Sequence, residues 1–475
     1  MMLLLYFILV LILSVLLLLV RGKALNTVIK ILFLAGQTAL SAYAFLHPGE
    51  QDSLYFKFDT IGTLLSLVLT VLSFATFYHS ELYIARHPST LRKDGFYYAS
   101  LFLLIAAMTG AYFADHLAVM WISIEATTVF VAILIYHEKN KTALEASWKY
   151  LFVSSIGVAL AFMGILFLSA IASEKGVSNL GFGPLLSIAP LMDPLWLKII
   201  FLLVLTGFSA KMGVAPLHTV TVDAHTAAPS PVSAFISTAL MNVGFLGIFR
   251  VYTILVHSEC RPWANALLML TGLISITLSA IQLLRIRHFK RMFAFSSLEH
   301  MGIVILALSL GRVGAYAAIL HLVFHSFVKA GLFYQIGQAH SIFHSYWIKD
   351  AGNYMKINPA GSLVMILGFI SITAMPPSGL FISEFLVFKA LFSAHHVVAA
   401  VYVLLLLCII LYVFATHLFK LLYSDETRNT GPGQIKLNGF ETVSQFILFA
   451  LVIYLGFFPP EFFTGLIRSA ITLIP

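Results

Sequence analysis

The chain has 475 residues, of which 60% are hydrophobic and only 10% are charged. Soluble domains carry about 25% charged residues, so this composition excludes a water-soluble globular protein. The formal net charge of +8 need not indicate nucleic-acid binding, because the loops on one side of a membrane protein are enriched in Lys and Arg. Cys260 and Cys408 are far apart, and no CxxC, paired Cys/His spacing or glycine-rich phosphate loop is present. The sequence therefore predicts no metal, haem, iron–sulfur or nucleotide site in this chain.

Apolar segments long enough to cross a bilayer, about 20 residues each, predict an all-α polytopic membrane protein with about fourteen transmembrane helices. The first, residues 1–20, has the length of a signal peptide, but its positive charges follow the apolar run. We interpret it as a retained span. The fourteen segments begin near Met1, Leu25, Thr60, Phe96, Leu117, Ala143, Trp196, Val232, Trp263, Met292, Ala315, Pro359, Val397 and Thr442.

The loop charges predict the orientation, because cytoplasmic loops are enriched in Lys and Arg. Loops and helix ends after odd-numbered helices hold 18 such residues and those after even-numbered helices hold 7. We therefore expect both termini outside a cell (inner) membrane. The 18 are Arg21, Lys23, Lys30, Arg86, Arg92, Lys93, Lys139, Lys141, Lys149, Arg285, Arg287, Lys290, Arg291, Lys349, Lys356, Lys420, Arg428 and Lys436.

Two of the predicted helices are interrupted in similar ways. The seventh reads FSAKMGVAPLHT and the twelfth reads SITAMPPSGLFISE, with Gly and Pro inside apolar runs. Such breaks in two halves of a chain are typical of inverted-repeat transporters with a site at the breaks. We predict three N-terminal helices in residues 1–94, two inverted five-helix repeats in 95–257 and 258–424, and a last helix in 425–475.

Ionisable residues inside membrane spans are costly and indicate function by default. Glu125 lies inside the fifth predicted helix, and Lys211 and Glu384 flank the two breaks. His321, His325 and Lys329 follow at i, i+4 and i+8 on one helix face. The predicted proton path also includes His218, His225 and His300.

The chemistry of these groups fits proton transfer. Burial favours the neutral form of a lysine, and a nearby carboxylate favours its charged form. Histidine, with a free pKa near neutrality, suits a bridge between such groups. Two structural alternatives remain open: Glu125 forms a static pair with Lys211, and Glu384 only anchors Lys329 or Lys389.

Five stretches resemble the antiporter-like membrane subunits shared by respiratory complex I, Mrp-type antiporters and membrane-bound nickel–iron hydrogenases. They are KTALEASWKYLFVSSIGVALAFMG, FSAKMGVAPLHTVTVDAHTAAPSPVSA, KRMFAFSSLEHMG, HLVFHSFVKAGLFYQIGQ and MPPSGLFISEF. The resemblance covers roughly residues 95–422 and is strongest to component F of hydrogenase-4.

The resemblance implies roles for matching residues. The family's fifth-helix glutamate matches Glu125, its seventh-helix lysine matches Lys211, and its twelfth-helix charged residue matches Glu384. Its eleventh-helix histidines and lysine match His321, His325 and Lys329. Two departures affect the centre of the path: Asn242 stands where many relatives have a lysine, and Ser237 where some have histidine.

The resemblance also implies a multi-subunit complex. This chain would hold no cofactor of its own and would translocate protons, or sodium ions, beside other membrane subunits and a peripheral redox arm. The partner subunits would carry a nickel–iron centre and iron–sulfur clusters. The alternatives are an Mrp-type sodium/proton antiporter, an energy-coupled inorganic-carbon uptake subunit, or a scaffold whose relay no longer conducts.

Overall fold

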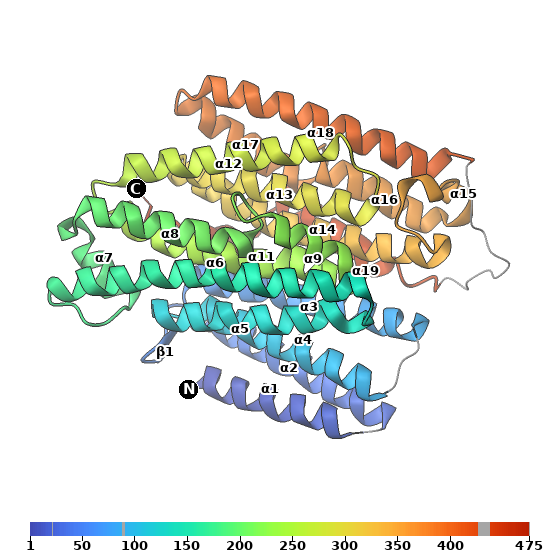
Figure 1. Ribbon diagram of the computed structural model, residues 1–475, viewed down its shortest axis with the longest axis horizontal. Coiled ribbons are helices and arrows are strands. Elements are labelled where there is room, and N and C mark those ends of the chain that lie inside the picture. Colours follow the sequence, from blue (N-terminus) through green and yellow to red (C-terminus); the bar gives the residue numbers. More distant parts are fainter. Residues whose placement is uncertain (21, 88–90, 426–437, 475) are drawn as a thin grey trace.

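A computed structural model describes residues 1–20, 22–87, 91–425 and 438–474, except for the side chains of residues 91 and 92. Arg21, Arg428 and Lys436 of the charge count lie outside the described residues, as does the side chain of Arg92. The described chain is helical apart from one short hairpin, and its helices run roughly side by side (Figure 1).

The elements in chain order begin with α1 (Met2–Leu19), α2 (Lys23–Leu46), β1 (Gln51–Ser53), β2 (Phe56–Lys57), α3 (Thr60–Arg86), α4 (Leu91–Phe113), α5 (Leu117–Ile135), η1 (Tyr136–Glu138) and α6 (Lys141–Glu174). Next come α7 (Phe182–Ile188), η2 (Ala189–Leu191), α8 (Pro194–Met212), α9 (Thr219–Ala227), α10 (Ser230–Phe235), the π-helix η3 (Ile236–Leu240), α11 (Met241–Leu255), α12 (Arg261–Leu283) and α13 (Phe289–Leu308). The last are α14 (Gly311–Phe343), η4 (Ile348–Asp350), α15 (Tyr354–Ile357), α16 (Pro359–Ile372), α17 (Gly379–Ser393), α18 (Val397–Tyr423), α19 (Val443–Phe457) and α20 (Glu461–Ala470).

The prediction of an all-α polytopic membrane protein is confirmed. Within the described residues, 12 helices are long and apolar enough to cross a membrane, or 13 if the bent pair α19–α20 is one span. The predicted twelfth span is two shorter helices, α16 and α17, separated by residues 373–378. The exact count of fourteen and the two five-helix repeats stay predictions.

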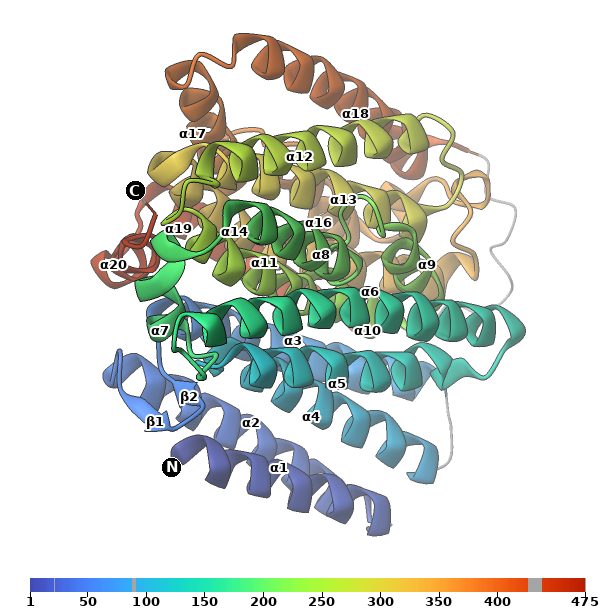
Figure 2. The same ribbon diagram turned by 60° about the vertical axis from the view of Figure 1, so that its left-hand side comes forward.

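The arrangement places the N-terminal helices and α18 on opposite flanks of the bundle (Figures 1 and 2). Both chain ends lie at the same end of the bundle in the two views. The continuous α10–η3–α11 unit is completely buried and α14 almost so, whereas only a third of α1 and α18 is buried. The polar side chains of α11 and α14 discussed below therefore lie in the centre of the bundle.

Close helix contacts use small residues, as expected where no hydrophobic effect drives association. Gly157 of α6 faces Gly207 of α8, and a Cβ added at Gly207 would lie 2.4 Å from the Gly157 carbonyl oxygen. This close approach brings α6 against the helix that carries Lys211.

Candidate functional site

Lys211 occupies the last turn of α8, just before the first break. Gly213 follows in the left-handed region, with φ 75°, and ends the helix. The Lys211 side chain is fully buried. Its Nζ donates to Thr128 Oγ1 at 2.6 Å and to Thr127 Oγ1 and the Tyr150 hydroxyl, each at 3.3 Å. The ammonium group is thus held by neutral hydroxyls.

Glu125 is half-buried on α5 and reaches Lys211 only indirectly. Its carboxylate accepts from Ser155 Oγ at 2.7 Å and from Thr128 Oγ1 at 3.3 Å. Since Lys211 donates to the same Thr128 oxygen, this hydroxyl connects the two charges. The ion pairs formed by the described residues do not include Glu125–Lys211. The geometry therefore does not match a static contact pair.

Gly244 of α11 fixes the position of Lys211, and Gly244→Ala should destabilise the protein. An added Cβ would lie 2.4 Å from the Met212 nitrogen and 2.8 Å from the Lys211 carbonyl carbon. Overpacking of this kind costs about 1–3 kcal/mol, so we expect a lower melting temperature of the purified protein. Gly183→Ala is the matched control, because an added Cβ there has no atom within 4 Å. Equal melting temperatures for the two variants would contradict this packing role.

Lys211, Glu125 and the hydroxyls that join them form the first cluster. The second cluster gathers around the break between α16 and α17. His300 Nδ1 on α13 shares a hydrogen bond of 2.9 Å with His321 Nε2 on α14. The centroids of the His300 and His325 rings lie 5.3 Å apart. His321 Nδ1 meets Ser383 Oγ on α17 at 3.0 Å. Glu384 is the next residue, and its carboxylate lies within 4.8 Å of nitrogens of His300 and His321. Four predicted path residues thus form one buried group.

A metal ion at His300, His321 and Glu384 would have two nitrogens and a carboxylate as ligands, a set that zinc accepts. Two of the histidine nitrogens, however, already bond to each other. A proton shared between the two rings makes direct use of this hydrogen bond.

Lys329 has a different carboxylate neighbour from the expected one. Its Nζ donates to the Phe293 carbonyl oxygen at 2.6 Å, and the carboxylate that interacts with it electrostatically is Glu299 of α13. The described ion pairs join Glu384 to neither Lys329 nor Lys389. The anchoring interpretation of Glu384 is therefore not supported by a contact.

Glu299 was missing from the predicted path. Its side chain is buried, and its Oε2 has no hydrogen-bond partner in the described chain. The signal was available in SSLEHMG, where a carboxylate directly precedes His300 in an apolar helix. This stretch alone does not show that the Glu299 side chain lies on the face of α13 near Lys329.

The two clusters are connected through α11 and the π-helix before it. α11 contacts the end of α8 at Gly244, and its Asn242 Nδ2 donates to Ser326 Oγ of α14 at 3.0 Å. Ser237 within the π-helix shares a hydrogen bond of 2.7 Å with Ser297 of α13. π-Helical turns inside α-helices are frequent at functional sites. At the position where many relatives have a lysine, this chain therefore has the Asn242 amide, with serine hydroxyls around it.

His225 and His218 occupy different surroundings on the segment after the first break. His225 is fully buried, both ring nitrogens lack partners in the described chain, and Lys329 and Lys290 act on it electrostatically. His218 is half-buried at the start of α9, and its Nδ1 has no hydrogen-bond partner in the described chain. Among the described hydrogen bonds, none joins His218 to another predicted path residue.

The predicted path residues other than His218, together with Glu299, form what we call the buried row. Its members are buried or half-buried and lie on α5, α8, α9, α13, α14 and α17. They are Glu125, Lys211, His225, Glu299, His300, His321, His325, Lys329 and Glu384.

A helical bundle with two broken helices and a buried row of titratable groups defines an ion-translocating class of membrane protein. The chain belongs to the NADH:quinone oxidoreductase/Mrp antiporter transmembrane family, whose sequence model matches residues 114–410.

Individual relatives agree with this family. The chain is 31% identical to a hydrogenase-4 component F homolog of Methylacidiphilum infernorum, with 79% of this chain and 80% of that protein covered. It is 28% identical to hydrogenase-4 component B of Escherichia coli, over 77% of this chain and 55% of that longer protein. A chain of the membrane-bound sulfane sulfur reductase, an archaeal respiratory membrane complex, shares the fold with a TM-score of 0.84 and 22% identity, over 99% of this chain and 97% of that one.

Proposed function

We propose that this chain is the proton-translocating, antiporter-like membrane subunit of a hydrogenase- or complex I-like oxidoreductase. The observation that carries the proposal is the buried row, in which hydrogen bonds join Lys211 to Glu125 through Thr128 and His300 to His321 and Ser383. A proton that shifts within one cluster changes the charge felt by its neighbours, so the groups titrate as coupled sites. Electron transfer elsewhere in the complex would drive these shifts.

The proposal assigns redox chemistry to partner subunits. This chain would contribute ion movement alone, and a nickel–iron centre and iron–sulfur clusters would belong to a peripheral arm and its neighbours. The similarity to component F and component B of hydrogenase-4 supports a hydrogenase-type complex. Purification of the complex from membranes, with partner identification by mass spectrometry, tests this. Partners that lack a redox subunit would contradict it.

The same complex in sealed vesicles tests ion movement. Supplying the electron donor should acidify or alkalinise the lumen, as read by a pH-sensitive dye. A signal that disappears on removal of Na⁺, while redox turnover continues, would assign sodium in place of protons.

We further propose a cell inner membrane with both termini outside and the 285–291 loop in the cytoplasm. The charge asymmetry of the loops supports this orientation. Lys290 is buried, whereas Arg285 is exposed. In a chain with Cys260 and Cys408 replaced by alanine, Arg285→Cys should react with an impermeant thiol reagent only from the cytoplasmic side. Lys175 is exposed directly after the C-terminal end of α6, on the side predicted to face outside. Lys175→Cys should therefore react only from outside, and the reverse pattern would overturn the orientation.

A further inference from the structure

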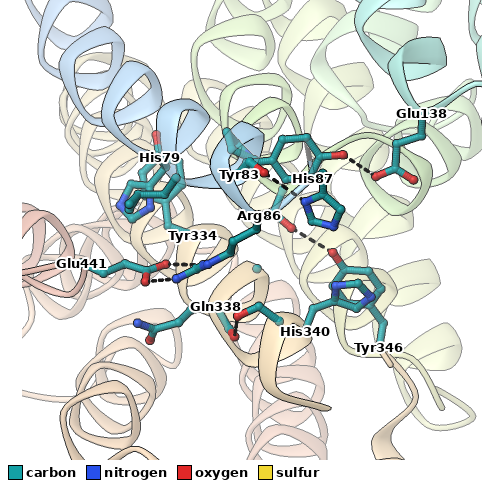
Figure 3. Close-up of a pocket in the computed structure, with 15 residues that line it drawn as sticks. His79, Tyr83, Arg86, His87, Glu138, Tyr334, Gln338, His340, Tyr346 and Glu441 are labelled. Carbon is teal, nitrogen blue, oxygen red and sulfur yellow. Dashed lines mark hydrogen bonds and ion pairs between the residues drawn. The ribbon is translucent and has the colours of Figure 1, made fainter. Parts of the chain in front are cut away.

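A polar cavity of about 110 Å³ lies outside the buried row, between the C-terminal ends of α3 and α14 and the start of α19 (Figure 3). A water molecule needs about 10–15 Å³ of such space, so the cavity has room for several. Most of the residues that line it carry titratable or polar side chains. Those used below are Arg86, Glu138, His340, Ser341, Tyr346 and Glu441.

The outer wall of the cavity is held by ion and hydrogen-bond pairs. Both Arg86 guanidinium nitrogens donate to the Glu441 carboxylate, one of them at 2.8 Å. The Tyr83 hydroxyl donates to Glu138 at 2.7 Å, and the Glu138 side chain is exposed. Figure 3 shows these pairs on opposite sides of the space that His340 and Tyr346 also border. Charged and polar groups of this kind favour water in the space between them, because polar atoms without a partner are costly to bury. Exposed Glu138 places one side of the cavity at the surface of the bundle.

The inner wall leads away from the solvent. The His340 ring stacks on the Tyr346 ring with centroids 3.9 Å apart, and the Tyr346 hydroxyl shares a hydrogen bond of 3.1 Å with Ser230 Oγ. Lys290 Nζ lies 4.7 Å from the centroid of the same Tyr346 ring. The cavity is thus one aromatic ring away from a buried lysine.

Lys290 continues the connection to the buried row. Its Nζ donates to the Ala228 carbonyl oxygen, in the short link between α9 and α10. His225, three residues earlier on α9, interacts electrostatically with both Lys290 and Lys329. Polar groups therefore lead from the cavity to the segment that carries His225, the member of the buried row nearest in sequence to the carbonyl that Lys290 binds.

We infer that this cavity is the water-filled mouth through which protons reach the buried row from the end of the bundle opposite the chain termini. The inference rests on the proposed function, since it assigns an access route to the same row. A proton entering through the cavity passes Tyr346 and Lys290 to His225. His225 accepts it at one ring nitrogen, releases one from the other toward Lys329, and returns to the neutral form.

A cysteine placed in the cavity tests the route in the assembled complex. Ser341→Cys, in a chain with Cys260 and Cys408 replaced by alanine, changes a hydroxyl to a thiol on the cavity wall. A small, positively charged, impermeant thiol reagent should react from the side where the cavity opens. Proton translocation in sealed vesicles should then be lost, while the complex stays assembled.

Thr142→Cys is the matched control, because Thr142 is exposed on α6 four residues after Glu138 and does not line the cavity. The same reagent should modify it without changing translocation. Three results would overturn the inference: Ser341→Cys does not react, it reacts and translocation continues, or both variants lose translocation on labelling.

Lys211→Ala separates this inference from the proposed function. If Lys211→Ala eliminates translocation and labelled Ser341→Cys retains it, the mouth is wrong and the row stands. If Lys211→Ala translocates normally, the proposed function itself fails. Tyr346→Phe adds a milder test of the inner step, because it keeps the stacked ring and removes only the hydroxyl bonded to Ser230. We expect slower translocation in Tyr346→Phe, and an unchanged rate would contradict the route past this hydroxyl.

Discussion

Lys211→Ala should reduce ion translocation to background while the subunit remains in its complex. Lys211 is the one cation of the first cluster, and its Nζ is held by the hydroxyls of Thr127, Thr128 and Tyr150. Without this ammonium group, the first cluster has no cation that can respond to Glu125. The measurement is proton uptake by sealed vesicles during redox turnover.

Assembly has to be measured on the same preparation. Removing one partner of a buried charge pair costs about 3–5 kcal/mol. The cost should be smaller here, because Glu125 is half-buried and keeps its bonds to Ser155 and Thr128. Lys211→Met fills the same space without the charge and serves if the alanine variant fails to assemble.

Lys198→Ala is the matched control on the same helix. Lys198 is only half-buried near the start of α8, so its removal should leave translocation unchanged. Assembled Lys211→Ala and Lys211→Met variants that pump at the rate of the unmodified protein would rule out the first cluster as part of the path.

Glu384→Gln should leave the complex folded but lower the number of protons moved per electron pair. The carboxylate lies within 4.8 Å of His300 and His321 nitrogens. The amide keeps the shape of the side chain and loses its ability to titrate. Because the described ion pairs do not involve Glu384, stability should change little. Glu384→Asp, which still titrates, should have the milder effect.

Proton release and thermal stability, measured together, decide between the two roles of Glu384. Glu174→Gln, at the exposed end of α6, is the control and should alter neither. A normal proton-to-electron ratio in a destabilised Glu384→Gln complex would assign Glu384 a structural role.

Which residues are unusual was readable from the sequence because the bilayer makes each one expensive. A charged side chain at the centre of a span costs about 2.5–3.5 kcal/mol on insertion scales. Lys211, Lys329 and Glu384 could therefore be singled out from their local apolar context. The two broken helices were equally local signals, since glycine and proline interrupt apolar runs at residues 213–216 and 376–379.

Which residues meet could not be read in the same way. Lys329 was expected beside Glu384 and instead interacts with Glu299. Glu125 reaches Lys211 only through the Thr128 hydroxyl. His218 was expected in the path, its Nδ1 has no hydrogen-bond partner in the described chain, and its place in the path stays a prediction.

The composition and hydropathy of this chain by themselves determined a polytopic helical bundle, its interrupted helices and its costly intramembrane charges. Only the tertiary structure decided the partners of those charges and the cavity bordered by Arg86 and Glu441, which are 355 residues apart in sequence. The physical reason is that helical periodicity fixes which residues share a face, whereas the rotation and depth of each helix depend on its neighbours. Close approaches such as Gly244 against Met212 set that register, and they exist only once the helices have packed.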